Sequence, residues 1–425
     1  MQSSDTTPST QSNNIPAGEK SKTPSRQAII FLMVTAFLST MGIGIFSPVL
    51  PFIVQRYVSD QNNLATAVGW LTSVYAICQF IAAPGLGILS DRYGRRPLLL
   101  LCLLGSAIGY GLFGLGGTIW VLFLGRIIDG LTGGNFSILF AYVADITEPE
   151  ERGKYFGLFG GVAGVGIIIG PVIGGFASKL GYQAPIYIAA AITLANVIWG
   201  YFNLPESLSQ EHRLANISLG ELNPFKQLRN VFALPQLRWL LLIGFFYAFP
   251  FAALQSNSAV LVKDSLGWSP DSIGMVFLAV GTVDILVQGV LVSRLLPILG
   301  EIKLTLGGLI CVIIGYLLIS SIAFVPSAIL LLAGIVLFAG GGGLIEPALR
   351  GLTSEAAGPR EQGVVQGGSQ SIQSLALILG PLWGALLYTQ LGHASPYWSG
   401  AALAVLAILL VFLAIPSICA HRSQK

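Results

Sequence analysis

Charged side chains are scarce in this sequence. Asp, Glu, Lys and Arg together make up 10% of the 425 residues, whereas a soluble chain carries about 25%. Hydrophobic residues make up 54% and glycine occurs 52 times. A water-soluble protein of this length could not cover its surface with so few charges, which excludes soluble, secreted and disordered proteins. The net charge of +3 is also too small to indicate nucleic-acid binding.

Cysteine and histidine are rare as well. The cysteines show no paired spacing, which excludes a disulfide framework and a metal cluster, and the histidines lie outside the apolar runs: Cys78, Cys102, Cys311, Cys419, His212, His393 and His421. The sequence has no G-x-x-x-x-G-K-[ST] loop for ATP phosphates. We therefore expect no metal, no cofactor and no ATP binding by this chain.

Long apolar runs dominate what is present. A helix needs about 20 apolar residues to cross the hydrocarbon core, and the sequence predicts twelve such spans: 28–55, 67–90, 97–116, 119–144, 156–180, 184–203, 237–262, 271–294, 303–322, 327–349, 362–388 and 396–418. Residues 1–27 are predicted to be a disordered cytoplasmic tail and 419–425 a second cytoplasmic tail. The polar stretch 204–236 is predicted to be a cytoplasmic linker between two six-helix bundles, 28–203 and 237–418.

The basic residues predict the orientation. With both termini in the cytoplasm, all of the 22 Lys and Arg residues lie on the cytoplasmic side except Arg56, Lys179, Lys263 and the intramembrane Arg126. We expect a multi-pass protein of the cell membrane that contacts the lipid bilayer and acts as a monomer.

The two halves of the sequence resemble each other. Gly157, Gly170-Pro171 and Gly174 recur at one constant offset as Gly367, Gly380-Pro381 and Gly384. Repeated bundles joined by a polar linker are typical of secondary transporters, whose substrate site lies near the middle of the membrane.

Three motifs resemble those of the major facilitator superfamily. The segment Gly87-Ile-Leu-Ser-Asp91-Arg92-Tyr-Gly94-Arg95-Arg96 is similar to the family's loop between helices 2 and 3. Arg126 to Gly130 resembles the R-x-x-x-G motif of helix 4, and Gly166 to Gly175 resembles the helix 5 signature of antiporters. Within the superfamily, the stretches Met41–Gly44, Pro48–Pro51, Tyr142–Thr147 and Pro347–Leu349 are most similar to drug:proton antiporters, and to tetracycline exporters in particular.

The resemblance implies two conformational devices. Asp91, Arg92, Arg95 and Arg96 would form a latch between the halves, with Asp91 beside the start of helix 11. The candidate partners of Arg95 and Arg96 are Asp91, the acidic loop Glu148/Glu150/Glu151 and lipid phosphates. Alternatively, these charges only set the orientation. Gly166, Gly170, Pro171 and Gly174, with Gly380, Pro381 and Gly384, would bend helices 5 and 11, although small residues also simply allow close helix packing.

Ionisable residues inside a membrane usually face a cavity or a charged partner. This sequence has four: Arg126 and Asp129 in helix 4, Asp284 in helix 8 and Glu346 in helix 10. Arg126 and Asp129 are three residues apart and can pair on one helical face, either as a structural pair or as one that protonation or substrate can open. Asp284 shares a face with Gln288, and its alternative role is a core hydrogen bond. Glu346 can instead reach the interface.

Uncharged polar residues on several helices predict a common aqueous path. They are Ser39, Tyr75, Gln79, Asn135, Tyr247, Gln255, Gln366, Gln370 and Gln373, with Thr35 and Thr72. Each alone is explained by a hydrogen bond between helices. The aromatic run from Phe245 to Phe251 favours an amphipathic, drug-like substrate over a sugar or phosphate.

The sequence departs from tetracycline exporters at the acidic residue of helix 1, where Ser39 stands, and it has no acid in helix 9. If the protein couples transport to protons, then Asp129, Asp284 or Glu346 must bind the proton. Asp284 is the first choice, because Arg126 beside Asp129 favours the charged form of that acid.

The function predicted is proton-coupled efflux of a small amphipathic compound by alternating access. One alternative is a facilitator or symporter for a sugar or organic anion, and another is a non-transporting receptor or scaffold. A membrane enzyme is disfavoured, because the apolar segments contain no nucleophile–base pair.

Overall fold

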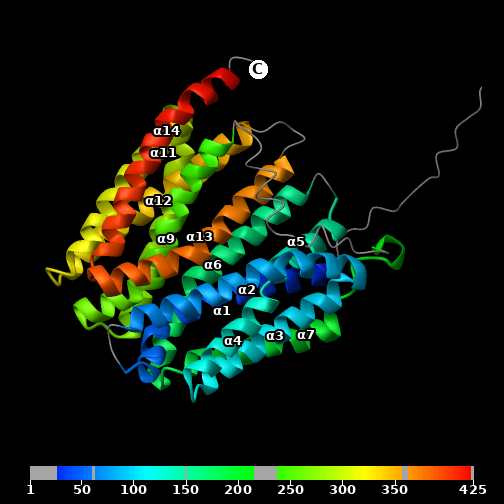
Figure 1. Ribbon diagram of the computed structural model, residues 1–425. Helices are drawn as coiled ribbons and strands as arrows, with labels where there is room; N and C mark the ends of the chain where they lie inside the picture. Colours follow the sequence, from blue (N-terminus) through cyan, green and yellow to red (C-terminus); the bar gives the residue numbers. More distant parts are fainter. Residues whose placement is uncertain (1–25, 60–62, 149–150, 215–236, 357–361, 423–425) are drawn as a thin grey trace, which may run out of the picture.

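The structure, a computed structural model, describes residues 26–59, 63–148, 151–214, 237–356 and 362–422, and these residues are helical with short connections. The first half contains α1 (Arg26–Val54), α2 (Leu64–Tyr93), α3 (Arg95–Leu115), α4 (Ile119–Thr132), α5 (Asn135–Ile146), α6 (Arg152–Ala177) and α7 (Ala184–Asn203). The second contains α9 (Arg238–Leu266), α10 (Pro270–Leu286), the π-helix η6 (Val287–Leu291), α11 (Val292–Ser321), α12 (Ala328–Ala356), α13 (Gln362–Leu391) and α14 (Ser395–Arg422) (Figure 1). The helix α14 continues past the predicted end at residue 418. Residues 1–25 of the predicted tail 1–27, residues 215–236 of the linker and residues 423–425 lie outside the described residues, and α1 begins at Arg26, within the predicted tail.

The described residues contain 11 segments long and apolar enough to cross a membrane, and one of them covers two predicted spans. That segment, Pro270–Ser321, is 52 residues long, or about 78 Å at the helical rise of 1.5 Å per residue, whereas one crossing needs about 30 Å. Gly300, with φ 72° and ψ 168°, interrupts it, a backbone conformation that glycine adopts without steric cost. The segment therefore accommodates two crossings, in agreement with the twelve predicted spans.

The fourth span is not the single helix predicted for 119–144. It is divided into α4 and α5 by Gly133 and Gly134. Two adjacent glycines weaken a helix because they add no side-chain contacts and lose the most backbone entropy. The Gln79 amide nitrogen donates to the Gly133 carbonyl oxygen at 2.9 Å, which satisfies a backbone group released by the break. Such a break inside a membrane span is tolerated where the backbone is buried in protein or lines a cavity.

The internal repeat seen in the sequence reappears in the packing within each half. In the first half, α6 packs on α1, and a Cβ atom on Gly170 would lie 2.5 Å from the Met41 carbonyl oxygen. In the second half, α13 packs on α9, and a Cβ atom on Gly380 would lie 2.6 Å from the Phe249 carbonyl oxygen. Both glycines are therefore required for close helix packing, which is the simpler of the two roles predicted for them.

The two halves contact each other through equivalent pairs of helices. A Cβ atom on Gly274 of α10 would lie 2.5 Å from the Pro171 carbonyl oxygen of α6, and one on Gly69 of α2 would lie 2.8 Å from the Pro381 carbonyl oxygen of α13. The Ser73 hydroxyl also donates to the Ile378 carbonyl oxygen at 2.7 Å. The contact between the halves thus follows the repeat, with α6 against α10 and α13 against α2.

These contacts lie toward one end of the molecule. We call it the hairpin end, because it carries the turns between helices at Gly116, Gly181, Gly267 and Gly392. It also contains an ion pair between Lys179 and Asp271, whose charged atoms are 3.3 Å apart. The opposite end, here the termini end, carries the starts of α1 and α9, the end of α14 and residues 204–214. The halves diverge toward the termini end (Figure 1). There, Cβ atoms on Gly153, Gly157, Gly160, Gly161 and Gly164 of α6 would meet nothing within 4 Å.

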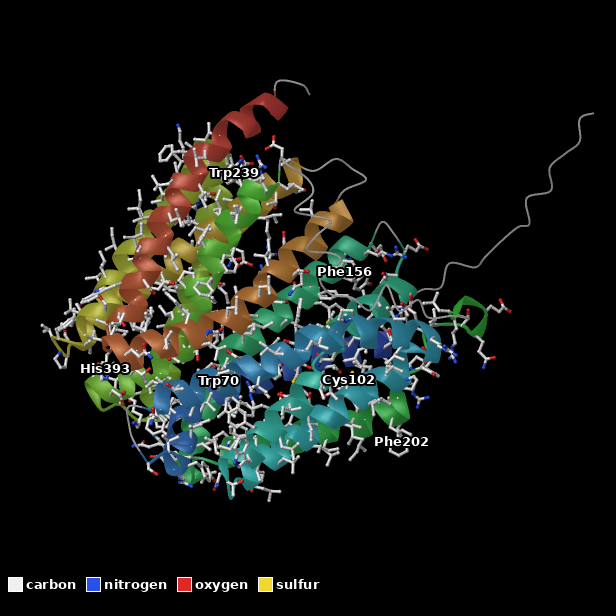
Figure 2. All side chains as sticks on the ribbon, in the orientation of Figure 1. Trp70, Cys102, Phe156, Phe202, Trp239 and His393 are labelled. Atoms are coloured by element: carbon white, nitrogen blue, oxygen red, sulfur yellow. The ribbon has the colours of Figure 1, made fainter. Side chains whose placement is uncertain are left out.

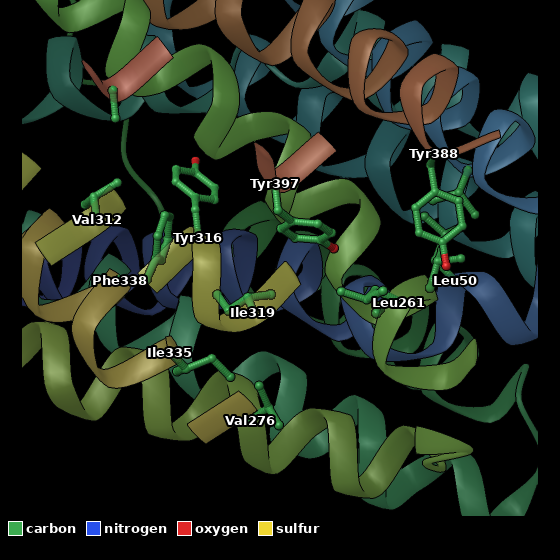
Figure 3. Close-up of a cluster of buried hydrophobic side chains, with 14 of the residues drawn as sticks. Leu50, Leu261, Val276, Val312, Tyr316, Ile319, Ile335, Phe338, Tyr388 and Tyr397 are labelled. Carbon is green, nitrogen blue, oxygen red and sulfur yellow. The ribbon is translucent and has the colours of Figure 1, made fainter. Parts of the chain in front are cut away.

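Large apolar side chains cover the outer surface of the bundle. Trp120, Phe202 and Ile329 are among the most exposed of them, and Phe202 points away from the first half in Figure 2. A buried cluster of hydrophobic side chains runs through both halves, and Tyr316, Phe338 and Tyr397 belong to its part in the second half (Figure 3). An apolar belt around helices of this length is what a bilayer requires of a protein that crosses it many times.

Candidate functional site

A polar cavity of about 20 Å³ lies inside the first half, next to the break between α4 and α5. Six helices contribute to its lining: Ser39 and Ile43 of α1, Tyr75 and Gln79 of α2, Leu103, Ser106 and Tyr110 of α3, Asp129 of α4, Asn135 and Phe136 of α5, and Thr193 of α7, with Gly133 of the break. The structure therefore brings together five of the predicted pathway residues from different helices: Ser39, Tyr75, Gln79, Asp129 and Asn135.

Arg126 lies beside this cavity and is held by several neighbours. Its side chain is 8% exposed. The guanidinium carbon lies 4.4 Å from the centroid of the Tyr75 ring and 4.9 Å from that of Phe46. The Nε atom is also 3.5 Å from the Leu71 carbonyl oxygen. Aromatic faces attract a desolvated cation, so the charge of Arg126 is stabilised by the rings in addition to its acidic partner.

Asp129 is the acidic partner of Arg126, as the spacing of the two residues predicts. The Arg126 Nη1 and Asp129 Oδ2 atoms are 3.5 Å apart, and the Asp129 side chain is 4% exposed. Within the part of the chain that the structure describes, Asp129 Oδ2 is buried without a hydrogen-bond partner. A distance of 3.5 Å is long for a charge-assisted hydrogen bond. The pair is therefore electrostatic and open, rather than closed by hydrogen bonds.

Other polar residues of the cavity bond to each other, and Ser106 is hydrogen-bonded to the Asp129 carboxylate. The Asn135 amide nitrogen donates to the Ser39 hydroxyl at 2.8 Å, which joins α5 to α1. Gln79 supports the Gly133 carbonyl and lies 3.4 Å from the Tyr75 hydroxyl. By contrast, Thr35 pairs with Asn196 in the core, and this pairing accounts for its polarity without any role in a pathway.

The second half places Asp284 and Gln288 on one face of α10 and η6, as predicted. The Gln288 amide nitrogen lies 2.9 Å from each carboxylate oxygen of Asp284. Gln288 belongs to the π-helix Val287–Leu291, which the apolar pattern did not predict. Single π-helical turns inside α-helices occur frequently at functional sites.

Two further predicted residues of the second half, Tyr247 and Glu346, lie on α9 and α12. A Cβ atom on Gly342 would lie 2.7 Å from the Tyr247 hydroxyl, and one on Gly343 would lie 3.1 Å from Asp284 Oδ1. Tyr247 and Asp284 therefore both face α12. Glu346 of α12 pairs with Arg350 one turn later, its side chain is 42% exposed, and it lies near enough to Asp284 and Tyr247 to interact with both electrostatically.

Four predicted glutamines and one residue of the aromatic run complete the predicted pathway of the second half. Gln255, Gln370 and Gln373 are exposed, and the side chain of Gln366 lies outside the described residues. Phe251 stacks on Phe338, with ring centroids 5.8 Å apart, so this member of the aromatic run packs in the core of the second half rather than in a pocket wall.

Within the part of the chain that the structure describes, the contacts of the loop predicted to be a latch are with its own half. Arg95 pairs with Asp91 and, through Nε at 3.1 Å, with Asp145 at the end of α5. Arg92 lies over the Tyr93 ring, and Gly87 has no neighbour within 4 Å of a Cβ position. Asp91 is predicted to lie beside the start of helix 11. Residues 357–361, next to that start, lie outside the described residues, so this position stays a prediction.

Sequence reasoning missed the main partner of this loop, which is Glu206. Its carboxylate accepts from the backbone amides of Arg95 at 2.8 Å and Arg96 at 3.2 Å, the first turn of α3. An anion is favoured there by the helix dipole and the unpaired amides. Gly94, with φ 106°, brings the chain against this carboxylate. The Arg96 Nη2 atom donates to the Tyr201 carbonyl oxygen.

Among the described residues, the predicted acidic loop at Glu148 and Glu151 is therefore not the partner of these arginines, and Glu150 lies outside the described part. The neighbouring segment is also fixed, because the Tyr142 hydroxyl donates to the Pro205 carbonyl and the Ser207 hydroxyl donates to Asp145 at 2.9 Å. An acid immediately after the last apolar run of the first half was the available signal for Glu206.

Replacing Glu206 by alanine is expected to lower the stability of the protein. The change leaves the amides of the first turn of α3 without their acceptor, and losing such a cap costs about 1–2 kcal/mol. The measurement is the thermal unfolding midpoint of the purified protein in detergent. Glu211→Ala is the matched control, because Glu211 is exposed in the same segment. Equal midpoints for the two variants would contradict the capping role.

Comparison with known proteins agrees with this architecture. The family profile described as Major Facilitator Superfamily matches residues 32–378, and a second match covers 257–422. The tetracycline resistance protein of class H from Pasteurella multocida is 34% identical over 390 residues, which are 92% of this chain and 95% of that protein. Multidrug resistance protein 2 of Bacillus subtilis (strain 168) is 30% identical over 375 residues, which are 87% of this chain and 91% of that protein.

Solved structures give the same result for the fold. A human organic anion transporter matches with a TM-score of 0.69 and 25% identity, over 91% of this chain and 99% of that one. A bacterial homologue of the lysosomal transporter Spinster, in an inward-facing and unoccupied conformation, matches with a TM-score of 0.71 and 16% identity, over 93% and 97%. With its fold, its repeat and its sequence all in agreement, this chain belongs to the major facilitator superfamily of membrane transporters.

Proposed function

We propose that this protein exports small amphipathic, drug-like compounds in exchange for protons. The observation that carries the proposal is a pair of polar clusters with ionisable residues in the membrane-spanning helices, Arg126 with Asp129 and Asp284 with Gln288, one in each half of the transporter. Among the described residues, the close contacts between the halves lie toward the hairpin end. Charges at this depth are costly unless they serve a pathway. Similarity to tetracycline and multidrug resistance proteins supports a drug-like substrate.

We further propose that the termini end faces the cytoplasm, in agreement with the distribution of Lys and Arg. The structure then corresponds to the state that loads substrate from inside. A rocking motion about the contacts of α6 with α10 and of α13 with α2 would close the termini end and open the hairpin end. The protein would act as a monomer in the cell membrane, without ATP.

Everted membrane vesicles from a host without its own exporters test this function. When respiration acidifies the vesicle lumen, we expect vesicles with this protein to accumulate tetracycline or another compound of an amphipathic drug panel, and to release protons when that compound is added. Vesicles from the empty host are the control.

Each alternative predicts a different outcome. Uptake that persists after the pH gradient is collapsed would indicate a facilitator. Inward transport of a sugar or organic anion together with protons would indicate a symporter. Binding of a compound without accumulation would indicate a receptor or scaffold. The Asp91→Asn variant is expected to lose turnover more than binding if the protein is a transporter.

A further inference from the structure

We infer that Asp129 is the carboxylate that binds the coupled proton, and that the break between α4 and α5 gives water access to it. This inference rests on the proposed function, because it assigns the proton-binding group of that exchange. It departs from the preference for Asp284 that the sequence suggests.

The surroundings of Asp129 carry the first part of the inference. Its carboxylate is almost fully buried, and Oδ2 has no hydrogen-bond partner within the described residues. A buried charged oxygen in this condition is costly, whereas a bound proton removes the charge. The helices packed against it contribute uncharged groups: Ser39 of α1, Tyr75 of α2, Ser106 and Tyr110 of α3, Asn135 of α5 and Thr193 of α7. Among the described residues at this cavity, Arg126 is the charged neighbour.

Arg126 can remain in place when Asp129 is neutral. Its guanidinium lies against the rings of Tyr75 and Phe46 and near the Leu71 carbonyl oxygen. Protonation of Asp129 therefore removes one attraction at 3.5 Å and leaves the others, so that α4 is released from its internal pair without unfolding. Protonation of Asp129 would therefore change the contacts of this one residue while the surrounding side chains stay in place, as a proton-coupling site requires.

The other two acids have closer partners and more solvent. Both oxygens of Asp284 accept from Gln288, and Glu346 pairs with Arg350 while its side chain is 42% exposed. Protonation of Glu346 would alter a partly exposed pair, which contributes little energy. Asp284 is hydrogen-bonded to Gln288 when charged, and a protonated Asp284 would again be hydrogen-bonded to it. Asp129 is the acid whose protonation changes a buried and unsatisfied contact.

The access path carries the second part of the inference. The cavity of about 20 Å³ beside Asp129 has room for a water molecule, which needs roughly 10–15 Å³ and polar partners. Gly133, Asn135 and Gln79 supply those partners at the helix break. A proton would pass from water in this cavity to Asp129 Oδ2, forming one O–H bond, and would return to water on the other side of the membrane after the halves rock.

Proton release on substrate binding tests the assignment in purified protein. The full chain in detergent, in weakly buffered solution with a pH indicator, is mixed with tetracycline or with the compound accumulated in the vesicle assay. We expect release from the wild type, complete loss of release in Asp129→Asn, and unchanged release in Glu211→Gln, an exposed control. Binding is followed separately by tryptophan fluorescence. Release that persists in Asp129→Asn and disappears in Asp284→Asn would overturn the assignment and leave the proposed exchange intact.

Two further results complete the test. If Asp129→Asn no longer binds the compound, Asp129→Glu decides: a shifted pH midpoint of release supports the assignment, and an unshifted midpoint overturns it. If the wild type binds the compound and releases no proton, the proposed exchange itself fails, and the assignment fails with it.

Discussion

The Gly170→Val variant is expected not to accumulate as folded protein. A Cβ atom at this position would lie 2.5 Å from the Met41 carbonyl oxygen and 2.9 Å from the Gly44 Cα atom. Both are backbone atoms of α1, so no side-chain rotation can make room. The helices α1 and α6 would have to separate along their length, at a cost on the order of 3 kcal/mol. The measurement is the yield of monodisperse protein after extraction, together with the thermal unfolding midpoint.

Gly161→Val is the matched control for this prediction. Gly161 lies on the same helix, and a Cβ atom there would meet nothing within 4 Å. The substitution has the same effect on helix propensity and adds the same volume, so its yield and unfolding midpoint should remain near those of the wild type. A Gly161→Val protein as unstable as Gly170→Val would show that helix propensity, rather than the contact with α1, requires glycine in α6.

The sequence predicted the fold closely because the bilayer restricts the choice of structure. Apolar runs long enough to span it must be helical, and the repeat of Gly170-Pro171 in Gly380-Pro381 predicted that the halves are alike. The break at Gly133 and Gly134 was not predicted. The hydropathy of a span is summed over all of its residues, so two glycines change it little. The glycine pair itself was visible in the sequence. The π-helix after Asp284 has no comparable sequence signal.

The candidate site was predicted less completely. The spacing of Arg126 and Asp129 was sufficient to predict their pairing, because they share one helical face. The proximity of Ser39 to Asn135, and of Gln79 to the break, depends on how α1, α2 and α5 pack, which the spacing within a helix does not determine. Glu206 was missed for the same reason. It lies far along the chain from the first turn of α3 and meets it only after α7 returns to the termini end.

Replacing Arg126 by leucine is expected to be the most damaging single substitution in the cavity. Removing one partner of a buried ion pair costs about 3–5 kcal/mol, because Asp129 is then left as a buried carboxylate without a cation. Asp129→Leu should cost less, since the guanidinium keeps the Tyr75 and Phe46 rings as neighbours. We expect this order in the thermal unfolding midpoints of the two purified variants, and loss of proton-driven uptake in both.

The double variant Arg126→Leu/Asp129→Leu distinguishes a coupled pair from two independent side chains. It removes both charges, so it should be more stable than Arg126→Leu alone, as expected when a buried ion pair is replaced by apolar residues. Independent roles would instead give additive losses, and the double variant would be the least stable of the three. A double variant more stable than the wild type but without uptake would show that the pair lowers the stability of the folded protein and that transport depends on it, which is the combination expected of a group retained for function.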